Sequence, residues 1–157
     1  MVPTSLFVLV VVPHDGRYLV VEERDGTFYL PAGKVEPGEN LIAAAVRETA
    51  EEAGVMIGLR GILGVDHDWF EPPHAQMRLR FCFVGYLALA MPPKTRPDHH
   101  SRGARWVTVD ELRALPQRHP EVLTWIERHE RAPALLPCAA YQPSGTTDGP
   151  PWSARLG

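Results

Sequence analysis

Three glutamates near the middle of the chain combine the residue type and the spacing that divalent-cation chemistry needs. Glu48, Glu51 and Glu52 stand at i, i+3 and i+4, so on a helix they fall within roughly one quadrant of its surface. Like charges at this spacing cost an isolated helix about 0.2–0.5 kcal/mol. A hard cation reverses that effect, because Mg²⁺ prefers oxygen ligands and suits two or three carboxylates together with substrate phosphates. The pattern therefore indicates a metal ion that neutralises a polyphosphate, polarises its phosphorus and lowers the pKa of a bound water.

A helix must position these carboxylates, and the surrounding residues predict one. Small and apolar side chains recur at helical spacing on a neighbouring arc, which we expect to face the core while the carboxylates follow the solvated side. These core-facing positions are Ile42, Ala45, Val46, Thr49 and Ala53. Gly54 ends the helix, as a glycine at C′ does. A purely solvated row of glutamates is the alternative, but the Gly- and Pro-rich loop 31–40, with its Glu39, and the adjoining Arg47 favour a functional site.

The segment 33–55 resembles the Nudix box, whose pattern is Gly, five residues, Glu, seven residues, Arg-Glu-apolar-any-Glu-Glu-any-Gly-apolar. The matching residues are Gly33, Glu39, Arg47, Glu48, Glu51, Glu52, Gly54 and Val55. Thr49 departs from the pattern, which usually has an aliphatic residue there, although the threonine methyl can still pack. The resemblance implies an α+β fold in which a mixed β-sheet is sandwiched between helices, with residues 1–131 as the Nudix hydrolase domain.

The resemblance also implies an enzyme, a metal-dependent pyrophosphohydrolase with Mg²⁺ or Mn²⁺ as its cofactor. Its substrate would be a nucleoside diphosphate linked to another group, which includes nucleoside di- and triphosphates and ADP-ribose-like compounds. A non-catalytic nucleotide sensor or regulatory module on the same fold is the alternative. A degraded box would favour that alternative, and this box is intact.

The family's site residues transfer to this chain by position. The metal ligands would be Glu48, Glu51, Glu52 and the backbone carbonyl of Ala32 beside Gly33. Glu48 is alternatively the base that activates water, and Glu39 would assist at a second metal or in that activation. Arg47 would hold a glutamate in place through a charge-assisted hydrogen bond rather than touch the substrate.

Four residues outside this segment are candidates for substrate binding: Arg78, Arg80, Trp69 and Asp98. Arg78 and Arg80 share one face of a predicted strand, where they would either clamp phosphate oxygens or form an exposed polar edge. Trp69 would either stack on a base or cover the core. Asp98 is a candidate for a late acidic ligand or base, and acidic residues of the predicted loop 66–74 compete for that role: Asp66, Asp68 and Glu71.

The remaining elements follow from periodicity and turn signals. Runs at 6–12 and 17–23, joined by a turn at 13–16, predict a hairpin; further strands are expected at 28–30, 55–65, 76–89 and 104–107. A capping box at Thr108–Glu111 opens one helix, and a last helix is expected over 121–131. Residues 132–157, which include Trp152, are rich in Pro and Gly and predict a loosely ordered tail.

Composition limits the class of protein. The chain has 157 residues, a net charge of −3 and 45% apolar residues, which fits one folded domain and excludes a general nucleic-acid binder. The apolar run Leu6–Val12 is too short for a membrane span, and no basic residue precedes it as in a secretory signal. We therefore expect a soluble cytoplasmic protein, a monomer or homodimer, whose partner is a nucleotide-derived substrate.

Overall fold

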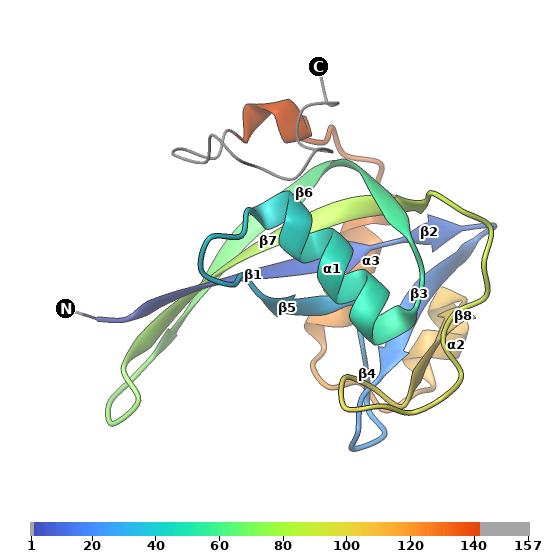
Figure 1. Ribbon diagram of the computed structural model, residues 1–157, viewed down its shortest axis with the longest axis horizontal. Coiled ribbons are helices and arrows are strands. Elements are labelled where there is room, and N and C mark those ends of the chain that lie inside the picture. The colour runs from blue at the N-terminus through green and yellow to red at the C-terminus, as the bar shows by residue number, and fades with distance from the viewer. Residues whose placement is uncertain (1, 142–157) are drawn as a thin grey trace.

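Two β-sheets with helices on both sides make up residues 2–141, the part of the chain that this computed structural model describes (Figure 1). The strands are β1 (Thr4–Val11), β2 (Pro13–His14), β3 (Arg17–Glu22), β4 (Phe28–Tyr29), β5 (Ala32–Lys34), β6 (Ile57–Phe70), β7 (Gln76–Leu87) and β8 (Gly103–Val107). The helices are α1 (Leu41–Ala53), α2 (Val109–Arg113) and α3 (Glu121–Glu130), with a 3₁₀ turn at Cys138–Ala140. No helix within this part of the chain is long and apolar enough to cross a bilayer.

The strand order separates two segments that the sequence predicts as one hairpin. The first sheet has the order β5-β1-β7-β6, with β1 antiparallel to β5 and parallel to β7. The second has the order β2-β3-β4, and β8 pairs with the other edge of β3. The predicted hairpin between 6–12 and 17–23 is therefore wrong, because β5 and β7 occupy both edges of β1. The hairpin is limited to the end of the first run, where Val12 and the short β2 pair with β3 around a turn in which Asp15 and Gly16 have positive φ.

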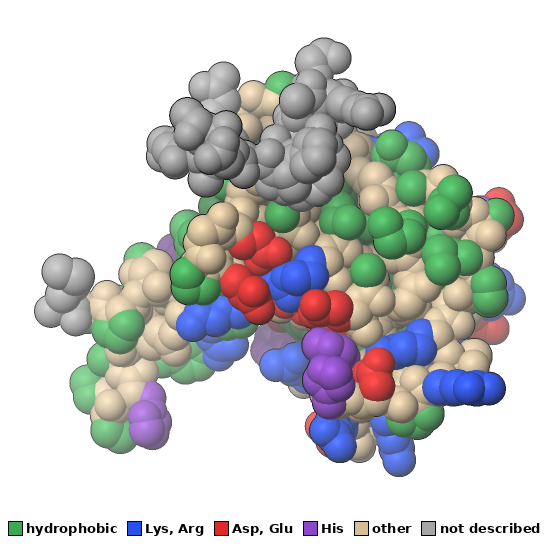
Figure 2. Space-filling model, in the orientation of Figure 1, with side chains coloured by type: hydrophobic (Ala, Val, Ile, Leu, Met, Phe, Trp, Pro, Cys, Tyr) green, Lys and Arg blue, Asp and Glu red, His purple; other side chains and the backbone are tan. Residues whose placement is uncertain are grey.

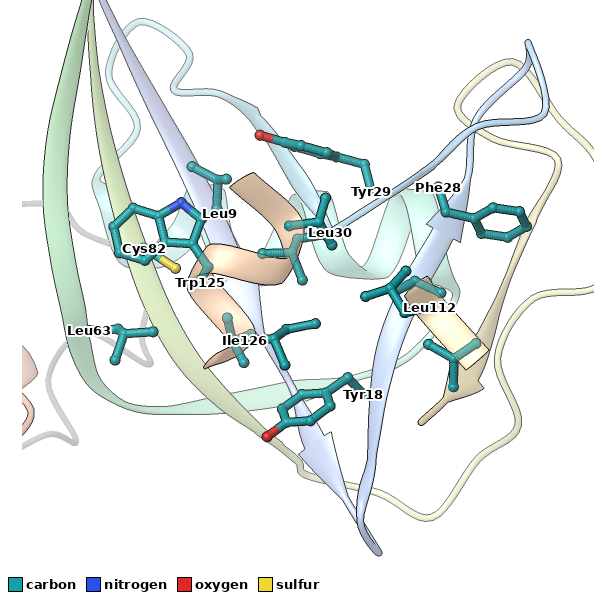
Figure 3. Close-up of a cluster of buried hydrophobic side chains, with 14 of the residues drawn as sticks. Leu9, Tyr18, Phe28, Tyr29, Leu30, Leu63, Cys82, Leu112, Trp125 and Ile126 are labelled. Atoms are coloured by element: carbon teal, nitrogen blue, oxygen red, sulfur yellow. The ribbon is translucent and has the colours of Figure 1, made fainter. Parts of the chain in front are cut away.

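Alternation along β1 explains why helices cover both faces of the structure. Val8, Val10 and Val12 pack in the cluster that contains the buried face of α1. Leu9 and Val11 point the other way, into the cluster that contains Leu112 of α2 and Trp125 and Ile126 of α3 (Figure 3). A strand buried on both faces reads as a continuous apolar run rather than an alternating one. The predicted α+β fold, a mixed sheet between helices, is confirmed.

Helix α1 has the bounds that its sequence signals predict. The Asn40 side chain caps its first turn by accepting a hydrogen bond from the Ala43 backbone, and Gly54 ends it in the left-handed region at φ 69°. The buried face is Leu41, Ala44, Ala45, Thr49 and Ala53. Thr49 fits the apolar face because its hydroxyl donates to the Ala45 carbonyl at 2.8 Å, which leaves no unpaired polar group. The capping box at Thr108 and Glu111 is also present, at the start of α2.

The segment 66–74, predicted as a loop, is mostly strand. β6 continues to Phe70, and residues 66–70 pair with 76–80 of β7 to form an arm that projects beyond the helices (Figure 1). The sequence of this arm resembles a loop because polar and aromatic residues replace the apolar alternation where no helix covers the strands. Cross-strand ion pairs such as that between Asp66 and Arg80 hold it together instead.

The chain after α3 contacts the sheet as far as it is described. The backbone of Leu136 exchanges hydrogen bonds with Ile62 of β6, and the Leu41 backbone N–H donates to the Tyr141 hydroxyl at 3.3 Å. Residues 133–141 of the expected loose tail are therefore tied to β6 and to the start of α1. Trp152 and the rest of the predicted tail lie outside the described residues.

Candidate active site

Arg47 lies at the centre of the carboxylate cluster on α1. Its guanidinium donates two hydrogen bonds to Glu39, at 2.8 and 2.9 Å, and reaches the Lys34 backbone carbonyl at 3.1 Å. One of its terminal nitrogens donates to both Glu48 and Glu51, at 2.8 and 3.1 Å. Figure 2 shows acidic and basic side chains gathered where Figure 1 places α1. Arg47 therefore ties Glu39 of the loop before α1 to Glu48 and Glu51, which are less than one helical turn apart on α1.

Glu48 and Glu52 are not on a solvated face, contrary to expectation. The Glu48 side chain is only 12% exposed and lies over Gly33, where a Cβ would overlap its carboxylate. Glu52 accepts a hydrogen bond from the Ala32 backbone N–H at 3.0 Å. Within residues 2–141, no Lys, Arg or His nitrogen lies within 4.0 Å of the Glu52 carboxylate. The short strand β5 therefore seats two of the three helix carboxylates against its backbone.

The electrostatics of this cluster favour the binding of an additional positive charge. Burial raises the pKa of Glu52 to about 8; repulsion from Glu48 and Glu23 adds to this rise, and the Ala32 hydrogen bond and Arg118 oppose it. Burial also raises the pKa of Glu48, opposed by Arg47. Arg47 in turn lowers the pKa of Glu39 through its hydrogen bonds. A buried carboxylate without a counter-charge is costly, and it either stays protonated or binds a cation.

The glutamate carboxylates have the chemistry that a hard divalent ion prefers, but they are not arranged around a common point. In the described range 2–141, no three His, Cys, Asp or Glu side chains are drawn together as a ready-made ligand set. Glu48 and Glu51 are turned toward Arg47, and Glu52 toward Ala32. All of these donors are oxygens, as Mg²⁺ and Mn²⁺ prefer, and three glutamates share one arginine while Glu52 pairs with none. The excess of negative charge fits a cation.

A cleft of about 440 Å³ opens beside β5, where Ala32 and Gly33 form part of its wall. The arm contributes Asp68, Trp69, Phe70, Arg78 and Arg80, the segment before α3 contributes Arg118 and His119, and the start of α3 contributes Glu121. Figure 2 shows a hollow between the arm and the body of the molecule. The cleft thus brings three of the four substrate-binding candidates, all but Asp98, next to β5, whose Ala32 backbone N–H donates to Glu52.

The two arginines of β7 have different surroundings. Arg80 binds Asp66 through two hydrogen bonds and forms ion pairs with Asp68 and Glu121, at 3.2 and 2.7 Å. Arg78 has no carboxylate within 4.0 Å among the described residues, and its Nε is buried without a hydrogen-bond partner. Its guanidinium instead lies over the Phe70 ring, 4.1 Å from the centroid. Trp69 is 51% exposed, so it does not cover the core.

Asp98 lies outside the cleft and organises a loop against the end of α1. It accepts hydrogen bonds from the Lys94 ammonium and from the backbone N–H groups of His100 and Ser101, which lowers its pKa. The same loop pairs the last carbonyls of α1: Lys94 donates to Glu51, Ser101 to Glu52 and the Lys94 backbone to Ala53. The structure therefore places Asp98 as a support for the helix rather than beside the substrate cleft.

The sequence does not predict a role at the site for four residues in or near the cleft: Glu23, Tyr29, Arg118 and Glu121. The Tyr29 hydroxyl donates to Glu121, whose other oxygen pairs with Arg80, so α3 is tied to the arm and to β4. Arg118 pairs with Glu23 at 3.2 Å beside the Tyr29 ring. Neither pair is close in sequence, and Arg118 lies in a loop without periodicity. Only the tertiary structure brings them together.

The sandwich of sheets and helices, with glutamates on the helix after β5, defines a class of phosphate-handling hydrolases. A family model described as the NUDIX domain matches residues 2–126, so this chain belongs to the Nudix (MutT-type) hydrolase family, whose members act on pyrophosphate bonds. Proteins called phosphatase NudJ, from Shigella boydii serotype 4 (strain Sb227) and Escherichia coli (strain K12), are each 36% identical over 117 residues. Each alignment covers 71% of this chain and 74% of the relative.

Solved structures show the same fold. A NUDIX hydrolase from Nitrosomonas europaea superposes with a TM-score of 0.76 at 32% identity, covering 89% of this chain and 97% of its own. The NUDIX domain of Shewanella oneidensis NrtR, solved with ADP ribose, has a TM-score of 0.62 at 15% identity, covering 84% and 88%. At that identity the second likeness concerns the fold alone.

Proposed function

We propose that this chain is a Mg²⁺- or Mn²⁺-dependent hydrolase of a pyrophosphate bond in a nucleoside diphosphate linked to another group. The observation that carries the proposal is the partly buried Glu52 carboxylate, which is hydrogen-bonded to the backbone of Ala32 in the cleft wall and has no cationic side chain within 4.0 Å among residues 2–141. A carboxylate in that state has a strong reason to bind a cation. Membership in a hydrolase family supplies the reaction class.

The residues of the box divide into groups with different proposed roles. Glu51, Glu52 and the Ala32 carbonyl would hold the metal beside Gly33, and Glu48 would serve as a further ligand or as the base for water. When bound, the metal supplies Lewis-acid chemistry that offsets the charge on the phosphates and acidifies a bound water. Glu39 would support water activation while paired with Arg47. Arg47 holds the glutamates in their orientation and does not reach the cleft wall.

The cleft supports a nucleotide derivative as the substrate class. Its lining combines cationic side chains, which suit phosphates, with the exposed ring of Trp69, on which a planar base can stack. The ADP ribose bound by the Shewanella oneidensis domain is a ligand of this class on the same fold. Cytoplasmic location and a monomeric or homodimeric state remain predictions.

A substrate panel with product analysis tests the reaction. The full chain is incubated with nucleoside di- and triphosphates, ADP-ribose and nucleotide sugars, each with Mg²⁺, with Mn²⁺ or with EDTA, and products are identified by mass. We expect release of a nucleoside monophosphate that depends on the metal. Tight nucleotide binding without turnover on any member of the panel would instead favour a sensor.

A further inference from the structure

Arg78 is an arginine whose charge the protein does not neutralise. Its Nε is the one side-chain nitrogen or oxygen in residues 2–141 that is buried without a hydrogen-bond partner. No carboxylate in this range lies within 4.0 Å of its guanidinium, although Asp68 stands opposite it in the β6–β7 register. Asp68 pairs with Arg80 instead. Burying an unpaired cationic donor costs free energy, so such a group calls for an acceptor from outside the chain.

Aromatic rings hold this guanidinium in place without using its N–H donors. Its Cζ lies 4.1 Å from the Phe70 centroid and 5.8 Å from the Phe7 centroid. Cation–π contacts of this kind stabilise the charge through the faces of the rings and use none of the N–H donors. The planar fork of an arginine matches the oxygens of a phosphate in a bidentate arrangement. Arg78 is thus preorganised to donate in its own plane.

Arg80, in contrast, has its donors occupied by carboxylates of the protein. Three carboxylates surround it, from Asp66, Asp68 and Glu121, and its side chain is only 14% exposed. Glu121 begins α3 and also accepts a hydrogen bond from Tyr29, so Arg80 links the arm to α3 and β4. With its donors used on this network, Arg80 has little capacity left for a ligand.

We propose that Arg78 is the phosphate-binding arginine of the cleft, whereas Arg80 is a structural link that does not contact the substrate. The inference rests on the proposed function and assigns one phosphate of the nucleotide-derived substrate to Arg78. Arg118, the other arginine in the cleft wall, already pairs with Glu23 and is 54% exposed. Among the arginines of the cleft wall, Arg78 is distinguished by its buried, unpaired Nε and by having no carboxylate within 4.0 Å among residues 2–141.

The experiment compares Arg78→Gln and Arg78→Lys with Arg60→Gln, which removes the same charge from β6 outside the cleft. Binding of ADP, inorganic pyrophosphate and adenosine is measured by calorimetry in EDTA, and steady-state kinetics are measured with Mg²⁺. We expect Arg78→Gln to weaken ADP and pyrophosphate binding by about 10- to 100-fold, which is the loss of a charged hydrogen-bonding partner. Adenosine binding should not change, and Arg78→Lys should recover only part of the loss because it lacks the fork.

The kinetic constants separate the two arginines. Arg78→Gln should raise KM with little change in kcat, as loss of uniform binding does. Arg80→Gln should lower the unfolding temperature, and below that temperature its affinity for ADP should stay within about twofold of wild type, because Arg80 does not contact the ligand. An Arg78→Gln variant with unchanged affinity and KM, or a wild-type protein that binds neither phosphate probe, would overturn the assignment.

Failure of this assignment is distinguishable from failure of the proposed function. Turnover with normal KM in Arg78→Gln would refute the role of Arg78 and keep the hydrolase. Phosphate binding that requires Arg78, without any metal-dependent turnover, would keep the role of Arg78 and refute the hydrolase. The binding readout in EDTA needs no metal, so it does not depend on the glutamate cluster being catalytic.

Discussion

The charge balance around Arg47 is the feature that explains the behaviour of the glutamates. One guanidinium holds Glu39, Glu48 and Glu51, while Glu52 is buried on the other side with only a backbone partner. Removal of the negative charge from Glu52 should therefore have opposite effects on activity and on stability. This opposition is typical of sites whose residues are retained for chemistry at a cost in folding.

Glu52→Gln should lower turnover by several orders of magnitude, because it removes a proposed metal ligand. In EDTA at pH 8 the same variant should unfold at a denaturant concentration no lower than wild type does. The raised pKa means that folding disfavours the charged form, so stability falls as the pH rises toward 8, and glutamine avoids that loss. Glu130→Gln, on the exposed side of α3, serves as the control. Unchanged turnover would contradict the metal assignment.

Gly33→Ala tests the seat of Glu48. A methyl group at this position would overlap the Glu48 carboxylate, which must then move away from β5. We expect a fall in kcat of at least about tenfold, since a shift of about 1 Å in a catalytic group can cost a hundredfold. Lys34→Ala changes the next, exposed residue of the same strand and should retain activity. Activity equal to wild type in Gly33→Ala would mean that the position of Glu48 is not critical.

At the scale of elements, the end of α1 is held by a loop that the sequence leaves without structure. The last four carbonyls of the helix, from Ala50 to Ala53, accept from the Gly54 backbone, the Lys94 side chain, the Ser101 side chain and the Lys94 backbone respectively. Helix ends normally leave such groups to solvent. Here the loop 94–101 fixes the turn of α1 that carries Glu51 and Glu52.

Ser101→Ala should therefore affect both stability and activity. It leaves the Glu52 carbonyl without its 2.6 Å hydrogen bond in a place where Ser101 is fully buried. We expect a loss of about 1–3 kcal/mol in the free energy of unfolding, together with a reduced kcat. Thr95→Ala, at an exposed position in the same loop, is the matched control. Chemical denaturation and initial rates measure the two effects, and a variant as stable as Thr95→Ala would show that the bond contributes nothing.

The helices and strands differ in how well the sequence predicts their bounds and their pairing. Helix α1 was predictable because its period and its Gly54 stop agree, and the eight matching residues of the box locate the site on and around it. The pairing of β1 was not, since a strand buried on both faces carries no signal for which neighbours it takes. The first strand of the arm was predicted as a loop for a related reason. Residues 66–70 lack apolar alternation, and the ion pairs that hold them form only in the folded protein. Asp98, Arg118 and Glu121 acquire their roles through contacts across the chain that no spacing encodes.

At the scale of the whole molecule, the core between the sheets and α3 includes a pH-sensitive contact. His129 on α3 lies 3.1 Å from the Tyr18 hydroxyl of β3, next to Glu130 and facing Arg60 of β6. Burial is the main cause that lowers the pKa of His129, and Arg60 adds to it. The folded protein thus keeps this imidazole neutral at pH values where the unfolded chain already binds a proton.

Acidification should therefore weaken the fold through His129. Because the folded pKa lies below the unfolded value of about 6.5, the free energy of unfolding should fall as the pH drops from 7.5 to 5.5. His129→Gln should flatten this dependence, and His99→Gln, in the loop before β8, should not. Urea midpoints at the two pH values measure the difference. Equal slopes in wild type and His129→Gln would exclude the contribution.

The projecting arm separates the proposed substrate-binding residues from the proposed metal-binding glutamates. The glutamates are attached to a helix locked into the core, whereas Trp69 and Arg78 are carried by strands that extend past it. Under the proposed function, substitutions in this arm should therefore change substrate selectivity while leaving the glutamates of α1 in place. A combinatorial library restricted to the arm is accordingly the economical way to seek altered selectivity in this scaffold.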